Sequence, residues 1–189
     1  MIDLSTIDAN QVIPGLWQGA APKPGSYPVD IIVLSAQSYQ PAADQFPGVQ
    51  VLRVPLRDVE KLPDPETLQT AIKVANQVAT AIRNGKKALV TCQKGWNRSG
   101  FVDGLVLRIL GASPDDTVRL LRAARGSDAL SNPVFEAYVR AFQPPKQPTT
   151  SWVGPIIFAA VITTGLGLLW FSRRTQPSRR VVRPQVANV

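Results

Sequence analysis

The sequence predicts an α/β protein in which a central, mostly parallel sheet is flanked by helices, followed by one C-terminal transmembrane helix. Short apolar runs rich in β-branched residues alternate with amphipathic segments as far as residue 142, which is typical of a parallel sheet. A proline-rich stretch follows at 143–151, and then 20 residues without a charge at 152–171. We therefore divide the chain into an α/β domain (1–142), a linker (143–151), a membrane span (152–171) and a basic tail (172–189).

The first half of the domain is expected to contain three buried strands and one long helix. The strands are the apolar runs at 29–35, 49–55 and 87–91. Asp64 is expected to cap the helix with Pro65 at its first position, and Asn84-Gly85 to end it. Its apolar stripe recurs every three or four residues from Leu68 to Ile82.

Three further helices are expected after the third strand. The first follows a loop and ends at Gly111. Ser113-Pro114 begins the second, which runs to about Ala124, and Asn132-Pro133 begins the last, which ends near Phe142.

The composition excludes several chemistries. The 189 residues include no His and one Cys. A Ser-His-Asp triad, a Cys-His dyad and a His-ligated metal are therefore excluded, as are an internal disulfide and a multi-cysteine metal site. The net charge is +8, of which residues 151–189 carry +5 through five Arg and no acid. The excess of positive charge thus lies mainly in the tail, and nothing in the sequence indicates a nucleic-acid partner.

The segment 152–171 is expected to be a single membrane span. As a helix it would be about 30 Å long, which matches the hydrocarbon core. Trp152 and Trp170 lie near its ends, where indole rings favour the interface, and Pro155 falls in its first turn. The alternative is a buried core helix, but the segment follows a linker and has no polar face. The tail behind it is expected to be disordered and to lie on anionic lipid.

The sole cysteine lies where chemistry is most expected, between the strand 87–91 and the next helix. The loop is Cys92-Gln93-Lys94-Gly95-Trp96-Asn97, and Arg98 and Ser99 open the helix. Backbone N–H groups of such a loop and of a helix N-terminus converge on one spot, and a mid-loop glycine permits the tight turn. Arg98 is placed to fork two oxygens of a bound phosphate. This setting favours the Cys92 thiolate, and Ser99 can donate a hydrogen bond to the sulfur.

Transfer of a phosphoryl group from an oxygen ester also needs an acid for the leaving group. Asp58 follows the strand 49–55, at the sheet edge where α/β proteins hold their active sites. Glu60 is an alternative, whereas the capping role of Asp64 already accounts for that residue.

The spacing Cys92-X5-Arg98-Ser99 after a buried strand resembles the signature loop of the cysteine-dependent tyrosine and dual-specificity phosphatases. The similarity extends over residues 12–142. The stretch 13–19 looks like the opening strand of the dual-specificity branch, Leu56-Arg57-Asp58 like its acid loop, and 122–135 like its closing segment.

The resemblance implies a two-step reaction without a metal or another cofactor. Cys92 takes the phosphoryl group from a Tyr, Ser or Thr phosphate of a protein while Asp58 protonates the leaving oxygen, and Asp58 then activates water. Asn132 supports the phosphate loop in this scheme. The family usually has His immediately before the Cys, where this chain has Thr91, which can still hydrogen-bond the loop.

Two other functions stay open at this point. A phosphoinositide phosphatase would use the same chemistry, and the membrane span, the basic tail and Lys94 fit a lipid headgroup. A phosphoprotein-binding module is the other alternative, supported by Thr91 and opposed by the presence of both a nucleophile and an acid.

Several residues near the site are given less weight. Lys94 could raise the local positive potential and Trp96 could flank the substrate, or both could be tolerated variable positions. Asp103 is expected to be a surface group or to support the site from behind. The arginines at 119, 122 and 125 recur every three residues and predict a solvated face, although an acidic substrate could use it.

The membrane orientation is predicted with conflicting signals. A reactive thiolate and phosphorylated substrates favour a cytosolic catalytic domain on a single-pass protein. The five Arg residues behind the span favour the cytosol for the tail instead.

Overall fold

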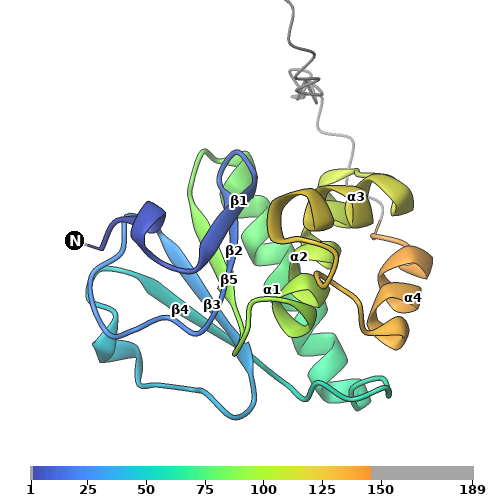
Figure 1. Cartoon of the computed structure of the whole chain (residues 1–189), viewed down its shortest axis with the longest axis horizontal. Coiled ribbons are helices and arrows are strands. Elements are labelled where there is room, and N and C mark those ends of the chain that lie inside the picture. The colour runs from blue at the N-terminus through green and yellow to red at the C-terminus, as the bar shows by residue number, and fades with distance from the viewer. Residues whose placement is uncertain (1, 146–189) are drawn as a thin grey trace, which may run out of the picture. The chain divides into compact units, whose positions relative to one another are not determined.

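The computed structural model describes residues 2–145. The rest of the linker, the predicted span 152–171 and the predicted tail 172–189 lie outside the described residues. Two short 3₁₀ turns, five strands and four helices make up the fold (Figure 1). The strands are β1 Ala9–Ile13, β2 Leu16–Gly19, β3 Ile31–Ala36, β4 Gln50–Leu56 and β5 Ala88–Thr91, and the helices are α1 Pro65–Arg83, α2 Asn97–Leu110, α3 Pro114–Arg125 and α4 Pro133–Ala141.

The sheet has the strand order β1-β2-β5-β3-β4. Strands β2, β5, β3 and β4 pair in parallel, and only β1 is antiparallel to its neighbour, so the mostly parallel sheet is confirmed. The carboxyl ends of the parallel strands meet at one edge. Cys92 directly follows β5 at this edge. Asp58 lies two residues after the end of β4, which is the next strand but one from β5 in the sheet.

The start of the domain differs from the single opening strand expected at 13–19. The chain forms the hairpin β1–β2, in which Ala9 pairs with Gly19 and Ile13 with Leu16. Gly15 makes the reversal possible because its φ is +88°, a backbone region in which side chains are strained.

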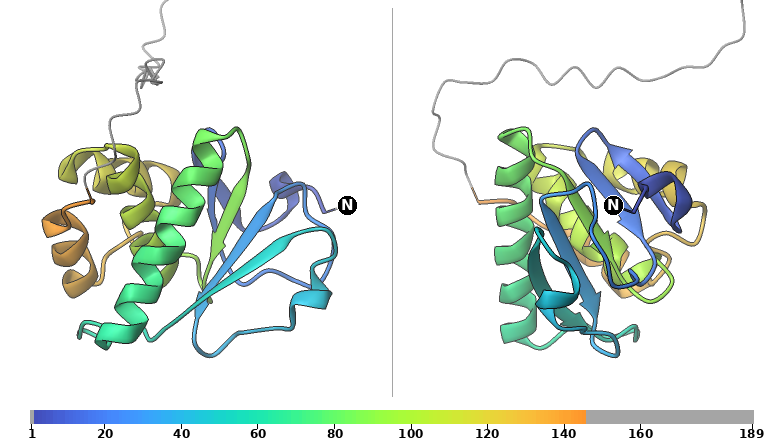
Figure 2. Two further views of the ribbon diagram at one scale, coloured as in Figure 1. Left: turned by 180° about the vertical axis from the view of Figure 1, so that it is seen from behind. Right: turned by 90° about the vertical axis from the view of Figure 1, so that its left-hand side faces the viewer.

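The helices cover one face of the sheet, rather than both (Figures 1 and 2). The larger core joins Val33 and Val90 of the sheet to buried residues of all four helices. The alternate side chains of the same strands, including Ile32, Leu34 and Leu89, pack against loop residues such as Tyr27 and Phe46 on the other face. Loops therefore replace helices on that second face.

The predicted helix ends are confirmed. Asp64 accepts a hydrogen bond from the Thr67 N–H at 2.9 Å, and Ser113 accepts one from Asp116 at 3.1 Å. Asn132 caps α4 through the N–H groups of Val134 and Phe135. Gly111 ends α2 with a φ of +103°.

Within residues 2–145, none of the helices combines the length and the apolar character that crossing a bilayer requires. The predicted span lies outside this range and stays a prediction.

Candidate active site

Cys92 lies at the bottom of a pocket of about 380 Å³ at the carboxyl edge of the sheet. Cys92 is only 3% exposed, and its backbone N–H donates a hydrogen bond to the carbonyl of Gly19 at 3.2 Å. The pocket brings together the predicted nucleophile, arginine and acid. It is lined by Asp58, Cys92, Gln93, Lys94, Trp96, Asn97, Arg98, Asp128 and Ser131.

The four carbonyl groups that follow Cys92 are all held by donors outside the loop. The Gln93 carbonyl accepts from the Ala21 N–H, and the Lys94 carbonyl accepts from Arg125. The carbonyls of Gly95 and Trp96 both accept from the buried Gln18 amide at 3.1 Å.

The backbone N–H groups of residues 93–99 make no hydrogen bond to another described residue. Because their carbonyls are tied elsewhere, these donors remain for a ligand at the N-terminus of α2. Converging N–H groups and the positive end of a helix dipole form an anion site. This arrangement is consistent with the phosphate-binding role predicted for residues 93–98, which stays a prediction.

Gly95 allows the loop to pass close to β2. Its φ is +71°, and a Cβ there would lie 2.6 Å from the carbonyl carbon of Gly19 and 2.7 Å from the Ala20 nitrogen. No side chain fits between these backbones, so the loop needs glycine for both conformation and space.

Arg98 is buried at the first turn of α2, with its guanidinium at the pocket. Nη2 donates to Gln93 Oε1 at 3.5 Å, and Nε lies 3.8 Å from Asp58 Oδ2. Both contacts are long, so the guanidinium keeps donors for a planar, two-oxygen contact with an oxyanion.

Asp58 is held toward the loop by two asparagines. Asn97 Nδ2 donates to Asp58 Oδ2 at 3.5 Å, and Asn132 Nδ2 donates to Oδ1 at 3.3 Å and to the Val59 carbonyl at 3.0 Å. The Asp58 side chain is 34% exposed, so it reaches both solvent and pocket. Asn132 also receives support, since its N–H donates to Asn97 Oδ1 at 2.8 Å.

Ser99 lies directly against Cys92. Its Oγ is 3.4 Å from Cys92 Sγ, and it also accepts from Gln18 Nε2 at 3.3 Å. Because Gln18 donates to this oxygen, the Ser99 hydroxyl can donate to the sulfur, and this role stays a prediction.

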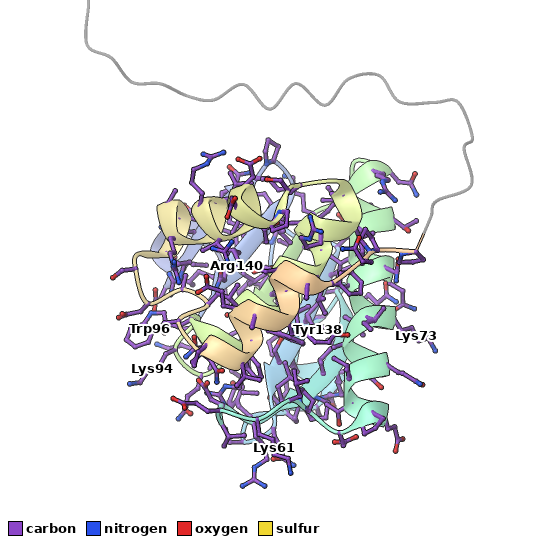
Figure 3. All side chains as sticks on the ribbon, turned by 90° about the vertical axis from the view of Figure 1, so that its right-hand side faces the viewer. Lys61, Lys73, Lys94, Trp96, Tyr138 and Arg140 are labelled. Atoms are coloured by element: carbon purple, nitrogen blue, oxygen red, sulfur yellow. The ribbon has the colours of Figure 1, made fainter. Side chains whose placement is uncertain are left out.

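Lys94 and Trp96 lie beside each other at the rim (Figure 3). The Lys94 ammonium is 5.0 Å from the Trp96 ring centroid, a cation–π contact. Both residues line the pocket. They therefore present a positive charge and an aromatic face to whatever enters it.

Thr91 does not hydrogen-bond the phosphate loop, contrary to expectation. Its hydroxyl donates to the Val33 carbonyl at 2.9 Å and so ties β5 to β3. Alternation along a strand places residue 91 on the opposite face from Cys92, which explains the difference.

The expectation of a solvated arginine face on α3 is wrong for two of its three residues. Arg119 is exposed and pairs with Asp116 at 2.8 Å, whereas Arg122 is half-buried against Glu136. The Arg125 side chain is 5% exposed, and it donates to the Gly95 and Lys94 carbonyls and to Asp8 and Asn10.

Arg125 and Gln18 are the supporting residues that sequence reasoning missed. Gln18 is separated by 77 residues from the carbonyl that it holds. A polar residue in an apolar strand was the only available signal.

Asp103 is not a surface group. It is fully buried in α2, and neither carboxylate oxygen has a hydrogen-bond partner among the described residues. Burial, and then the charge of Cys92, raise the pKa of Asp103 well above its usual value.

The residues at the pocket suit an anion rather than a cation. Among residues 2–145, no three His, Cys, Asp or Glu side chains gather as metal ligands. The carboxylate of Asp58 is instead next to Arg98 and two amide donors.

Comparisons with known proteins place this geometry in a known fold. No family model matches the chain, and no curated protein matches it in sequence. Among solved structures, a mouse putative dual-specificity phosphatase complexed with zinc tungstate is 25% identical with a TM-score of 0.59, covering 74% of this chain and 89% of its own. Human DUSP28 is 26% identical with a TM-score of 0.58, covering 70% of this chain and 90% of its own. The TpbA protein of P. aeruginosa shares the fold at 21% identity and a TM-score of 0.54, covering 76% of this chain and 89% of its own.

The chain therefore has the fold of the dual-specificity phosphatases. At this level of identity, the likeness supports a phosphatase function, and the details of the chemistry depend on the site itself.

Proposed function

We propose that this protein is a cysteine-dependent protein phosphatase of the dual-specificity or tyrosine type. One observation carries the proposal: Cys92 lines a pocket together with residues 93–98, and the backbone N–H groups of residues 93–99 donate to no other described residue. A phosphate dianion bound by these groups and by Arg98 would place its phosphorus against Sγ.

The reaction proceeds in two displacements. Cys92 Sγ attacks phosphorus while the ester bond breaks, and Asp58 gives its proton to the leaving oxygen. Asp58 then takes a proton from water, whose oxygen attacks the thiophosphate. Phosphate leaves, and the sulfur regains its electron pair with the Ser99 hydroxyl 3.4 Å away.

The experiment is phosphate release by the full chain from a phosphotyrosyl peptide, with Asp58→Asn as the test variant. Loss of the general acid should lower kcat by about 10²-fold or more. Glu60→Gln and Asp64→Asn are the matched controls, since Asn also serves as an N-cap, and both should keep wild-type kcat. A normal rate in Asp58→Asn would contradict the assignment of the acid.

A phosphoinositide phosphatase is the second candidate, favoured by Lys94 at the rim and by the predicted membrane span. The acid Asp128 also lines the pocket and opposes a ligand with several phosphates, so we place protein substrates first. Rates on phosphotyrosyl peptide, phosphothreonyl peptide and phosphoinositide micelles distinguish the two. A strong preference for the lipid would overturn the choice of protein substrate.

The proposal includes tethering to a membrane through residues 152–171, with the basic tail on anionic lipid and the catalytic domain in the cytosol. The uncharged length of this segment and its flanking Trp and Arg residues support this part. Flotation of the full chain with vesicles, compared with a chain ending at residue 150, tests the tether. Protease protection of the tail in sealed vesicles tests the orientation, and an accessible tail would contradict it.

A further inference from the structure

The proposed mechanism makes no use of Asp103, although this carboxyl is buried behind the nucleophile. Asp103 is 0% exposed, and both of its oxygens lack a hydrogen-bond partner among the described residues. An unpaired carboxylate is among the costliest groups to bury, and a neutral carboxyl is far less costly. Whether Asp103 carries a charge therefore matters both for the cost of burying it and for the charge of Cys92.

Asp103 lies on the helix face that meets the nucleophile. It follows Ser99 by four residues on α2, so the two side chains share one face. The Ser99 hydroxyl is 3.4 Å from Cys92 Sγ. Among the ionisable groups of the described residues, Cys92 is the one whose charge raises the pKa of Asp103, in addition to the larger effect of burial.

No buried cation of the described residues is placed to neutralise Asp103. The buried faces of α1, α3 and α4 carry Ala, Val, Leu, Phe and Thr side chains, and the helix-facing side of β2, β3 and β5 carries uncharged residues up to Cys92. Arg108, on the same helix, donates to carbonyls of Ala112 and Phe142 at the far end. Arg98 lies at the pocket beside Asp58.

A buried acceptor on the neighbouring strand β2 also favours a protonated carboxyl. Gln18 Oε1 has no hydrogen-bond partner among residues 2–145, and an amide oxygen can only accept. The amide nitrogen of the same side chain donates to Ser99, so Gln18 lies against α2. A carboxylic acid supplies a donor to such a region, whereas a carboxylate supplies only more acceptors.

We propose that Asp103 stays uncharged behind the Cys92 thiolate, so that the two groups hold one proton and one negative charge between them. An ionised Asp103 would place a second anion next to the thiolate in a buried site and would drive Cys92 back to the thiol. The inference rests on the proposed function for the role of the thiolate, and its tests do not depend on phosphate release.

The first test measures the Cys92 thiolate directly. Cys92 is the only cysteine of the sequence, so the rate of alkylation of the full chain by iodoacetamide reports on this one thiol. In Asp103→Asn, a neutral group replaces a neutral group, and the pH midpoint of alkylation should stay within about 0.3 of the wild-type midpoint. A midpoint lowered by about one pH unit or more would show that Asp103 is ionised in the resting protein, and would overturn the proposal.

The second test uses urea unfolding of the full chain between pH 5 and pH 8, followed by circular dichroism. An unfolded Asp ionises near pH 3.9, but Asp103 keeps its proton on folding, so folding takes up one proton. Relative to Asp103→Asn, the folding equilibrium constant of the wild type should fall tenfold for each unit by which the pH rises. This fall should level off at the pH where Asp103 of the folded protein ionises. A difference that does not change with pH would overturn the proposal.

Two further variants keep the second test decisive. Asp103→Val removes both oxygens at similar volume and should show the same pH trend as Asp103→Asn, so the result does not depend on the folding of one variant. Asp44→Asn, at an exposed position, should show no trend against the wild type. A protein that passes both tests yet releases no phosphate would contradict the proposed function and leave the charge state of Asp103 standing.

Discussion

The mouth of the phosphate loop, formed by residues 93–98 and Asp58, differs from the region behind Cys92, where Asp103 lies, in how its polar groups are hydrogen-bonded. At the mouth, the carbonyls of residues 94–96 are held by donors from β2 and α3, and Asp58 is held by two asparagines. Next to Cys92, the Asp103 carboxyl is buried and has no hydrogen-bond partner among residues 2–145. Hydrogen bonds therefore fix the geometry of the mouth, whereas the role proposed for Asp103 behind Cys92 depends on its lack of charge.

The largest effect at the mouth is expected from Arg98→Lys. A lysine keeps the positive charge but loses the planar fork that binds two oxygens, so kcat/KM for a phosphomonoester should fall by about 10²- to 10³-fold. Arg57→Lys, at an exposed position of the Asp58 loop, is the matched control. If Arg98→Lys retained wild-type kcat/KM, charge rather than geometry would govern the mouth, and the comparison would fail.

The next effect is expected from Gly95→Ala. The added Cβ would lie 2.6 Å from the carbonyl carbon of Gly19 at a φ of +71°, so the loop must shift. We expect a loss of about 1–3 kcal/mol in the free energy of unfolding, and weaker binding of inorganic phosphate. Gly48→Ala is the control, because it has a similar φ of +79° with nothing within 4 Å of the added Cβ. Equal losses in both variants would mean that the close approach to β2 is unimportant.

A smaller effect is expected from Arg125→Gln, which removes a donor from behind the mouth. The Gly95 and Lys94 carbonyls would lose a charged donor, and KM for a phosphomonoester should rise by about tenfold, with less change in kcat. Arg122→Gln, one turn earlier on α3, pairs with Glu136 and should leave KM unchanged. A rise of KM in both variants would assign the effect to α3 as a whole.

Local signals in the sequence were enough for the helix ends and for the strand-to-helix loop that carries Cys92. Asp64, Ser113 and Asn132 each cap a helix by accepting from N–H groups two or three positions away, so tertiary packing has little influence on these caps. Cys92, Arg98 and Ser99 are likewise set by one strand-to-helix connection.

The residues that support this loop could not be found in the same way. Arg125 reaches the loop only because α3 packs against β1, and its three-residue spacing is equally typical of an exposed helix face. Gln18 holds carbonyls 77 and 78 positions away. Asp103 looked like a polar position on a helix, and only the packing of α2 on the sheet shows that it is buried.

The most direct measurement of the central claim is the mass of the full chain, quenched in acid during turnover of p-nitrophenyl phosphate. We predict one phosphoryl group on Cys92, more of it in Asp58→Asn, whose hydrolysis step lacks its base, and none in Cys92→Ser, with phosphate release lowered by about 10⁴-fold or more in that last variant. Phosphate release that continues in Cys92→Ser, or turnover without a phosphoryl group on this cysteine, would contradict the assignment of Cys92 as the nucleophile.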